Sequence, residues 1–225
     1  MKTASRALLE LALEIGALEL FPDPDKQRIL KSGRMSPYFF NSGLFYDGKS
    51  LSRLTSAYVA ASEELAYDVV FGPAYKGIQL AGEIASAMWR MHGMNVGCAY
   101  NRKEAKDHGE GGIWVGAPVR GKRVLVVDDV ISTGRSKAEA YDLIREQGGT
   151  PVGCVVGFDR QEVVNVGDTV SAAEKFTTET GLPVFSATNV TDLQELLSVN
   201  DGPYAAPVLS LISDYLLTYG KARQT

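Results

Sequence analysis

The sequence predicts an α/β fold, a mostly parallel sheet flanked by helices, with a small lobe (the hood) over the carboxyl ends of the strands. From residue 68 onward, short apolar runs typical of strands alternate with longer segments of helical periodicity. Residues 124–127 are uninterruptedly apolar, as in a strand buried on both faces of a parallel sheet. Before residue 67 this alternation is absent, which indicates a separate lobe.

Composition limits the organisation and the class of partner. We expect one domain over residues 1–225, with the hood formed mainly by about residues 20–50 plus C-terminal elements. A net charge of −4 argues against general nucleic-acid binding, and no apolar run reaches membrane-spanning length. Glutamates interrupt the N-terminal apolar segment, so it predicts an amphipathic helix and no signal peptide. Two cysteines within predicted strands favour free thiols in a cytoplasmic protein.

The N-terminal elements follow from spacing and from helix breakers. Leu8, Leu9, Leu11 and Ile15 keep helical spacing, and the sequence Phe-Pro-Asp-Pro-Asp at residues 21–25 ends this helix. Residues 27–46 contain short strand-like pieces separated by Gly and Pro, and a second helix is expected over residues 51–65.

The remaining elements alternate in a βα rhythm. Runs rich in Val and other residues that favour pleated sheets predict strands at residues 68–71, 96–100, 123–127, 152–158 and 183–186. Helical spacing of apolar residues predicts helices at residues 78–91, 137–147, 172–180, 191–199 and 204–219. Such alternation implies right-handed crossovers and a mostly parallel sheet.

Two carboxylates, Asp128 and Asp129, directly follow the buried run, and a turn of small hydroxyl residues comes next. Carboxylates at a strand end accept hydrogen bonds from sugar hydroxyls or hold a hydrated Mg²⁺. The turn at residues 132–136 opens a helix, whose free N–H groups suit a phosphate. Together they describe a site for ribose 5-phosphate. The acidic pair alone would equally suit ordinary turn chemistry or a metal site without ribose.

A second turn of similar design comes earlier in the chain. The sequence Phe-Gly-Pro-Ala-Tyr-Lys-Gly at residues 71–77 ends a short strand, brings in a lysine and starts a helix. Taken singly it would be an ordinary Gly-Pro turn with a solvated lysine. Two such turns in one βα array suit a ligand with two anionic parts, such as a diphosphate beside a ribose phosphate.

A charged, glycine-rich stretch follows the predicted strand at residues 96–100. Three cations and three acids lie between residues 102 and 110, and three glycines lie nearby. Most such runs are solvated, salt-bridged surface loops. Here the stretch joins strand ends at the functional edge, contains His108, and has the glycines that lids need. We therefore expect a mobile catalytic loop at about residues 101–116.

Five motifs resemble those of known enzymes. Asp-Asp-x-x-x-Thr-Gly-x-Ser, starting at Asp128, resembles the phosphoribosyl-pyrophosphate (PRPP) motif of the type I phosphoribosyltransferases. Arg-Lys-Glu-x-Lys-Asp-His-Gly, starting at Arg102, is similar to the catalytic loop of the orotate phosphoribosyltransferase family. Residues 30–41, 71–77 and 159–161 resemble this family's hood segment, diphosphate loop and Asp-Arg-Gln segment, in the family order.

The resemblance implies a reaction and its requirements. Orotate phosphoribosyltransferases transfer ribose 5-phosphate from PRPP to N1 of orotate, giving orotidine 5′-monophosphate and diphosphate in pyrimidine biosynthesis, with Mg²⁺. The family works as a homodimer in which loop residues act across the interface, so the implied partners are PRPP, orotate and a second copy of the chain.

The resemblance also implies site residues. Asp128 and Asp129 would hold the ribose hydroxyls and, indirectly through PRPP oxygens and water, the Mg²⁺. The other implied PRPP contacts are Lys31, Tyr75, Lys76, Arg102, Lys103, Lys106, His108, Val130, Ile131, Ser132, Thr133, Gly134, Arg135 and Ser136. The implied catalytic residues are Lys103, Lys106, Asp107 and His108, and the implied orotate contacts are Phe39, Phe40, Ser132 and Arg160. Arg160 has a chemical reason as well, because a guanidinium binds a carboxylate such as that of orotate bidentately.

One position departs from the family pattern, and other functions compete. Orotate enzymes often have a small hydroxyl residue where Arg135 stands, so either a phosphate donor is lost or the guanidinium points to solvent. One alternative function is a phosphoribosyltransferase for another base, such as a purine or uracil. Another is a non-catalytic regulator that senses PRPP, but this would need an output module such as a basic DNA-binding extension.

Overall fold

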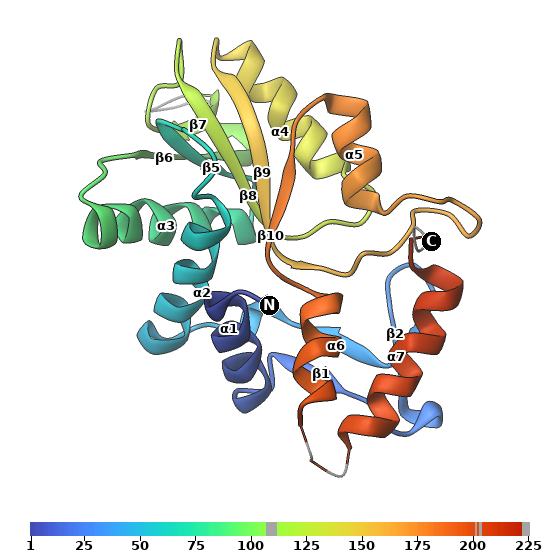
Figure 1. Cartoon of the computed structure of the whole chain (residues 1–225). Helices are drawn as coiled ribbons and strands as arrows, with labels where there is room; N and C mark the ends of the chain where they lie inside the picture. The colour runs from blue at the N-terminus through green and yellow to red at the C-terminus, as the bar shows by residue number, and fades with distance from the viewer. Residues whose placement is uncertain (107–111, 201, 203, 222–225) are drawn as a thin grey trace.

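The computed structural model describes residues 1–106, 112–200, 202 and 204–221, and its centre is a six-stranded sheet (Figure 1). The strand order is β10-β9-β8-β5-β6-β7. The strands are β5 (Val69–Gly72), β6 (Gly97–Lys106), β7 (Gly112–Gly116), β8 (Arg123–Val130), β9 (Thr150–Asp159) and β10 (Val184–Asn189). All neighbours are parallel except β6 and β7. This confirms the predicted mostly parallel sheet.

Helices cover both faces of the sheet, because the strand side chains alternate between two cores. Leu125 and Val127 of β8 join the core under α1 (Thr3–Glu14), α2 (Gly48–Ala61), α3 (Lys76–His92), α6 (Val190–Ser198) and α7 (Ala205–Tyr219). Val124 and Val126 face the other core, under α4 (Arg135–Glu146) and α5 (Ala172–Thr180). In Figure 1, α2 and α3 lie on one side of the sheet and α4 and α5 on the other.

The chain reverses its winding direction between β5 and β8, which are neighbours in the sheet. From β5 the chain passes through α3, on one face, to β6. From β8 it passes through α4, on the opposite face, to β9. This is a topological switch point, the place in open α/β sheets where ligands bind beyond the carboxyl ends of the strands.

The hood contains two small antiparallel ladders. β1 (Leu18–Leu20) pairs with β4 (Tyr38–Phe40), and β2 (Arg28–Ile29) pairs with β3 (Met35–Ser36). Short 3₁₀ turns at Pro24–Lys26 and Ser42–Leu44 complete it. These elements gather with α6 and α7 at the lower end of the view in Figure 1. Hydrogen bonds from Ser42 to Asp129 and from Arg160 to Ser36 join the hood to the carboxyl ends of β8 and β9.

The stretch expected as a loop at residues 101–116 is largely strand in the structure. β6 continues to Lys106, and β7 begins at Gly112 and runs back along it, pairing Tyr100 with Val115. Trp114 anchors this hairpin, because its ring stacks on Phe71 with centroids 4.9 Å apart. None of the described helices is long and apolar enough to span a membrane.

Candidate active site

The two acidic residues at the end of β8 are held by different lysines. Asp129 Oδ2 lies 2.6 Å from Lys76 Nζ and accepts a bond of 3.2 Å from Ser42 Oγ. Burial by itself would raise the pKa of the Asp129 carboxyl, but Lys76, Lys137 and Ser42 outweigh it and the pKa is lowered. Asp129 is therefore ionised at neutral pH and can accept hydrogen bonds on both carboxylate oxygens.

Asp128 is held by Lys137, a residue that the sequence analysis did not single out. Lys137 Nζ lies 2.5 Å from Asp128 Oδ2 and also donates to the Val130 carbonyl at 2.5 Å and to Ser136 Oγ at 3.2 Å. These bonds use all three of its donors, which explains how its side chain can be buried. The helical spacing contained a signal, because Lys137 starts the buried stripe that Ala140, Tyr141 and Ile144 continue.

The turn after β8 is shaped to receive an anion. Ser132 and Thr133 are exposed, and Gly134 has a left-handed φ of 76°, where a Cβ atom would lie 2.5 Å from the Phe176 ring. α4 then begins at Arg135 with no side-chain cap in the described structure, so its first N–H groups remain available to a phosphate. The Arg135 side chain pairs with Glu139 at 2.8 Å and is 85% exposed. Of the two possibilities for this position, a lost phosphate donor or a guanidinium that points to solvent, the structure shows the second.

The turn after β5 forms a second cradle. A Cβ atom on Gly72 would lie 1.8 Å from the Gly77 carbonyl oxygen, so the backbone closes on itself in a way that only glycine permits. The Ala74–Tyr75 peptide is cis, and Ala74 N donates to Asn101 Oδ1 of β6 at 3.1 Å. Lys76 opens α3, again without a side-chain cap in the described structure. Both cradles thus lie at the switch point, one after β5 and one after β8.

The cations of β6 lie beside the second cradle. Lys103 Nζ is 4.6 Å from the centroid of the exposed Tyr75 ring. Arg102 Nη1 donates across the hairpin to the Gly112 carbonyl at 3.1 Å. Lys31 is exposed in the turn between β2 and β3. The side chain of Lys106 and the whole of Asp107 and His108 lie outside the described residues, so their roles stay predictions.

The two hood phenylalanines lie on opposite faces of β4, because side chains alternate along a strand. Phe40 is buried and stacks on Phe158, with centroids 5.3 Å apart. Phe39 is half-buried, and the Arg28 guanidinium lies 4.7 Å from its centroid. Of this pair, Phe39 therefore has the more accessible ring.

Arg160 follows β9 and reaches into the hood. Its Nη2 donates to Ser36 Oγ at 2.9 Å, its Nε donates to Glu162 Oε1 at 2.6 Å, and the guanidinium lies 4.2 Å from the Tyr38 ring centroid. Two of its five N–H donors are used in these bonds, which leaves donors for a substrate carboxylate.

A metal site at the acidic pair would need ligands from elsewhere. Among the described residues there is no group of three or more His, Cys, Asp or Glu side chains that could hold a metal ion. Asp128 and Asp129 contribute two carboxylates. This donor set fits Mg²⁺, which keeps several waters and is bound through one or two carboxylates and substrate phosphates.

Comparisons with known proteins agree with this geometry. A family model, the phosphoribosyl transferase domain, matches residues 52–170. An orotate phosphoribosyltransferase from Stenotrophomonas maltophilia is 48% identical over 194 residues, which cover 85% of this chain and 86% of that protein. The chain belongs to the orotate phosphoribosyltransferase family.

Solved structures of orotate phosphoribosyltransferases share the fold. One from Francisella tularensis matches with a TM-score of 0.81 and 32% identity over 95% of this chain and 98% of its own. Another, from Mycobacterium tuberculosis in complex with PRPP, matches with a TM-score of 0.62 and 25% identity over 84% of this chain and 98% of its own. Membership in the orotate phosphoribosyltransferase family confirms the resemblance drawn from the motifs.

Proposed function

We propose that this chain is a transferase of the pentosyl class that moves ribose 5-phosphate from PRPP to N1 of orotate, in pyrimidine biosynthesis. The observation that carries the proposal is the pair of anion cradles at the β5–β8 switch point, with the acidic pair beside them and Arg160 reaching into the hood. Family membership supports the same reaction. It is also the reason to prefer orotate over another base.

The reaction needs no protein nucleophile. Orotate N1 forms a bond to the anomeric carbon and gives up its proton to the departing diphosphate or to solvent, while the bond from that carbon to the diphosphate oxygen breaks and the diphosphate leaves with the electron pair. Substitution at this carbon readily takes on oxocarbenium character, as in glycoside hydrolysis. The protein then has three tasks, which are aligning two small anions, neutralising the leaving diphosphate and excluding water.

The sugar-phosphate half of PRPP belongs to β8 and its turn. Asp128 and Asp129 accept hydrogen bonds from the ribose hydroxyls. The backbone N–H groups and hydroxyls of residues 130–136 hold the 5′-phosphate, with the N-terminus of α4 behind them. The exposed Arg135 side chain is not needed for this, so Arg135→Thr should change PRPP affinity only modestly.

The diphosphate half belongs to the second cradle and its cations. Lys76 is 55% exposed and is bound to Asp129, so it can exchange this carboxylate for the diphosphate. Asp129 then becomes free for the ribose. Lys31, Tyr75 and Arg102 contribute further contacts. Mg²⁺ bound with PRPP would neutralise diphosphate charge, held by Asp128 and Asp129 through water and PRPP oxygens.

The base site lies under the hood. Arg160 pairs with the orotate carboxylate, and Ser132 contacts the base from the phosphate turn. Phe39 borders the ring of orotate. Phe40 supports it from the core, where it stacks on Phe158.

For the charged stretch at residues 101–116, we propose that Lys103, Lys106 and His108 act in the neighbouring site of a homodimer, and that Asp107 is a further catalytic residue. Mixing a Lys106→Ala subunit with an Asp128→Asn subunit tests this, because a heterodimer would collect both defects in one site and leave the other intact. Restored activity is expected. Heterodimers that stay inactive would refute action across the interface.

The direct test of function is the PRPP-dependent loss of orotate absorbance with purified protein and Mg²⁺. Uracil and hypoxanthine serve as control bases, and removal of Mg²⁺ with a chelator should stop turnover. Turnover of orotate would also exclude a purely PRPP-sensing regulator. A cytoplasmic location is part of the proposal, supported by Cys98 and Cys154, which are both free thiols.

A further inference from the structure

Glu162 lies between two arginines beneath the hood. Its Oε1 accepts from Arg160 Nε at 2.6 Å, and its Oε2 accepts from Arg34 Nη1 at 2.8 Å. All three side chains are largely buried, with exposed fractions of 11–14%. Arg34 is committed elsewhere as well, because its Nη2 donates to the carbonyls of Val163 and Val164. Glu162 therefore joins a fixed arginine to the arginine proposed to bind substrate.

The C-terminal helix α7 contributes a hydroxyl to the same carboxylate. Tyr215 OH donates to Glu162 Oε1 at 2.9 Å, the oxygen that also accepts from Arg160. Burial, with the charge of Glu162, raises the pKa of Tyr215 to about 12, so the phenol is protonated and donates at neutral pH. Tyr215, which is 53 positions from Glu162 in the sequence, thus helps to hold Oε1 in place.

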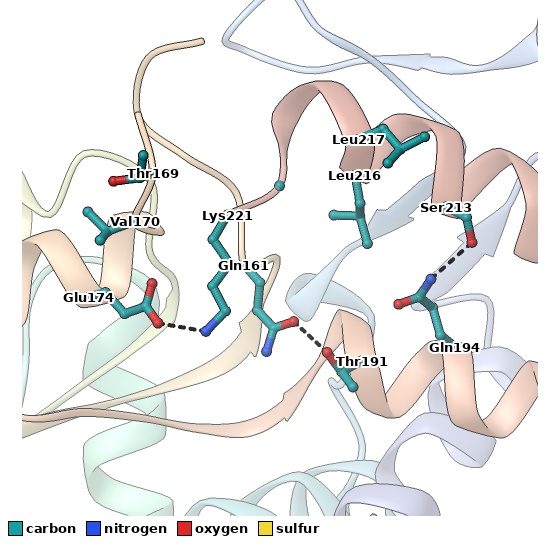
Figure 2. Close-up of a pocket in the computed structure, with 11 residues that line it drawn as sticks. Gln161, Thr169, Val170, Glu174, Thr191, Gln194, Ser213, Leu216, Leu217 and Lys221 are labelled. Carbon is teal, nitrogen blue, oxygen red and sulfur yellow. Dashed lines mark hydrogen bonds and ion pairs between the residues drawn. The ribbon is translucent and has the colours of Figure 1, made fainter. Parts of the chain in front are cut away.

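The backbone around Arg160 is tied to the end of α7. Val163 N donates to the Tyr219 carbonyl at 2.8 Å, and Lys221 N donates to the Gln161 carbonyl at 3.2 Å. Figure 2 shows the side chains at this junction, where Gln161 binds Thr191 of α6 and Lys221 pairs with Glu174 of α5. Gln161 itself has a left-handed φ of 52°. Hydrogen bonds to α6 and to the end of α7 therefore hold the segment that carries Arg160 in place.

From this geometry we infer that Glu162 and Tyr215 are positioning residues that aim Arg160 at the orotate carboxylate, which gives α7 a part in base recognition. The inference rests on the role proposed for Arg160. Bidentate binding requires the guanidinium and the carboxylate to be coplanar. Glu162 and Ser36 hold Nε and Nη2 of Arg160, and the Tyr38 ring lies against the guanidinium, so its plane is set before substrate binds. Pre-organisation of this kind lowers the cost of binding.

Conservative variants test the inference. Tyr215→Phe removes one hydroxyl, and Glu162→Gln keeps the shape of the side chain but removes its charge. We expect the KM for orotate to rise about 3–10-fold in Tyr215→Phe and at least tenfold in Glu162→Gln. The kcat and the KM for PRPP should stay within about twofold, because the ribose and diphosphate contacts are elsewhere. Tyr219→Phe, on the same helix, is the matched control and should behave as wild type.

Two further measurements separate positioning from general damage. Uracil lacks the carboxylate, so its inhibition constant against orotate should not change in the variants. A distorted base site would instead weaken uracil binding and raise this constant. Thermal unfolding checks the fold, and if Glu162→Gln does not fold, Tyr215→Phe alone decides. Equal losses for orotate and PRPP, or an unchanged KM for orotate in folded variants, would overturn the inference.

Arg160→Gln keeps this test distinct from the proposed function. If Arg160→Gln raises the KM for orotate and the Glu162 and Tyr215 variants do not, only the positioning role fails. If Arg160→Gln itself leaves that KM unchanged, the proposed base site fails and the positioning role fails with it.

Discussion

Lys137 and Asp128 form a buried ion pair at the carboxyl end of β8, with Nζ and Oδ2 2.5 Å apart and side chains only 5% and 13% exposed. The other acidic residue, Asp129, is paired instead with Lys76, whose side chain is 55% exposed. The two carboxylates therefore differ in function. Asp128 has a permanent partner within the fold, and Asp129 has a partner that a ligand can take over.

Replacing Lys137 by Met should destabilise the protein by about 3–5 kcal/mol, because it leaves a buried carboxylate without its counter-charge. The KM for PRPP should rise, since the same ammonium holds the Val130 carbonyl at the start of the phosphate turn. Urea unfolding and steady-state kinetics measure the two effects. Lys175→Met is the control, because Lys175 is 37% exposed and its pair with Asp168, at 4.0 Å, is worth little.

A double variant sharpens this test. Asp128→Asn removes the charge that Lys137 compensates, so the two substitutions together should cost less than the sum of their separate effects. Strict additivity, or a Lys137→Met variant as stable as wild type, would show that the pair contributes nothing.

Gly72→Ala should disrupt the diphosphate cradle. A methyl group at this position would lie 1.8 Å from the Gly77 carbonyl oxygen, so the backbone would have to move. We expect a loss of stability on the order of 3 kcal/mol or more, together with loss of PRPP binding. Gly82→Ala in α3 is the control, since nothing lies within 4 Å of a Cβ atom there and the helix should gain about 0.5–1 kcal/mol. PRPP titration calorimetry and thermal unfolding on both variants measure the difference.

Removing the hydroxyl of Tyr38 should leave stability unchanged or increase it. Tyr38 is completely buried, and its hydroxyl has no hydrogen-bond partner in the described part of the chain. Folding therefore removes this hydroxyl from water without replacing the hydrogen bonds that water made to it. Tyr58→Phe is the contrast, because Tyr58 OH donates to the Asp128 carbonyl at 2.7 Å and its loss should cost about 1–2 kcal/mol. Unfolding free energies that change equally in the two variants would contradict this reasoning.

Asp68, at the end of the sheet opposite the site, should make the stability of the protein depend on pH in the acid range. Arg123 binds the Asp68 carboxylate and lowers its pKa to about 2, below the value of about 4 in an unfolded chain. Because the folded pKa is the lower one, this contribution to stability is present above about pH 4 and is lost as the pH falls toward 2. The difference in melting temperature between wild type and Asp68→Asn should therefore shrink between pH 5 and pH 2.5. A difference that stays constant over this range would exclude the linkage.

Much of the fold could be predicted from the sequence, because its signals are local. Helical spacing places α5 at residues 172–180, and the apolar run before Asp128 identifies a central strand. The phosphate turns are local too, since glycine and hydroxyl residues follow directly after strands. The second helix was less well placed, because Asp47 caps it and it begins at Gly48, before the expected residue 51.

Features that depend on distant contacts could not be predicted. The charged residues after Tyr100 concealed the continuation of β6 and the edge strand β7. These two strands pair with each other, and the stacking of Trp114 on Phe71 stabilises the pair. The ion partner of Lys137 could not be predicted, because the sequence does not show that Asp128 lies beside it in the fold. The side chains that bind Arg160 are Ser36, 124 positions earlier in the sequence, and Glu162, which accepts a further hydrogen bond from Tyr215. No spacing rule connects these residues.

Because β5 and β8 are neighbours, the sheet itself sets the distance between the two cradles that we propose for the substrate. Neighbouring strands lie about 4.8 Å apart, and their ladder of hydrogen bonds holds the spacing between the two cradles constant. In the proposed function, recognition of the base depends instead on the hood and on the end of α7. Substitutions in these parts should therefore change the choice of base without altering the distance between the two cradles.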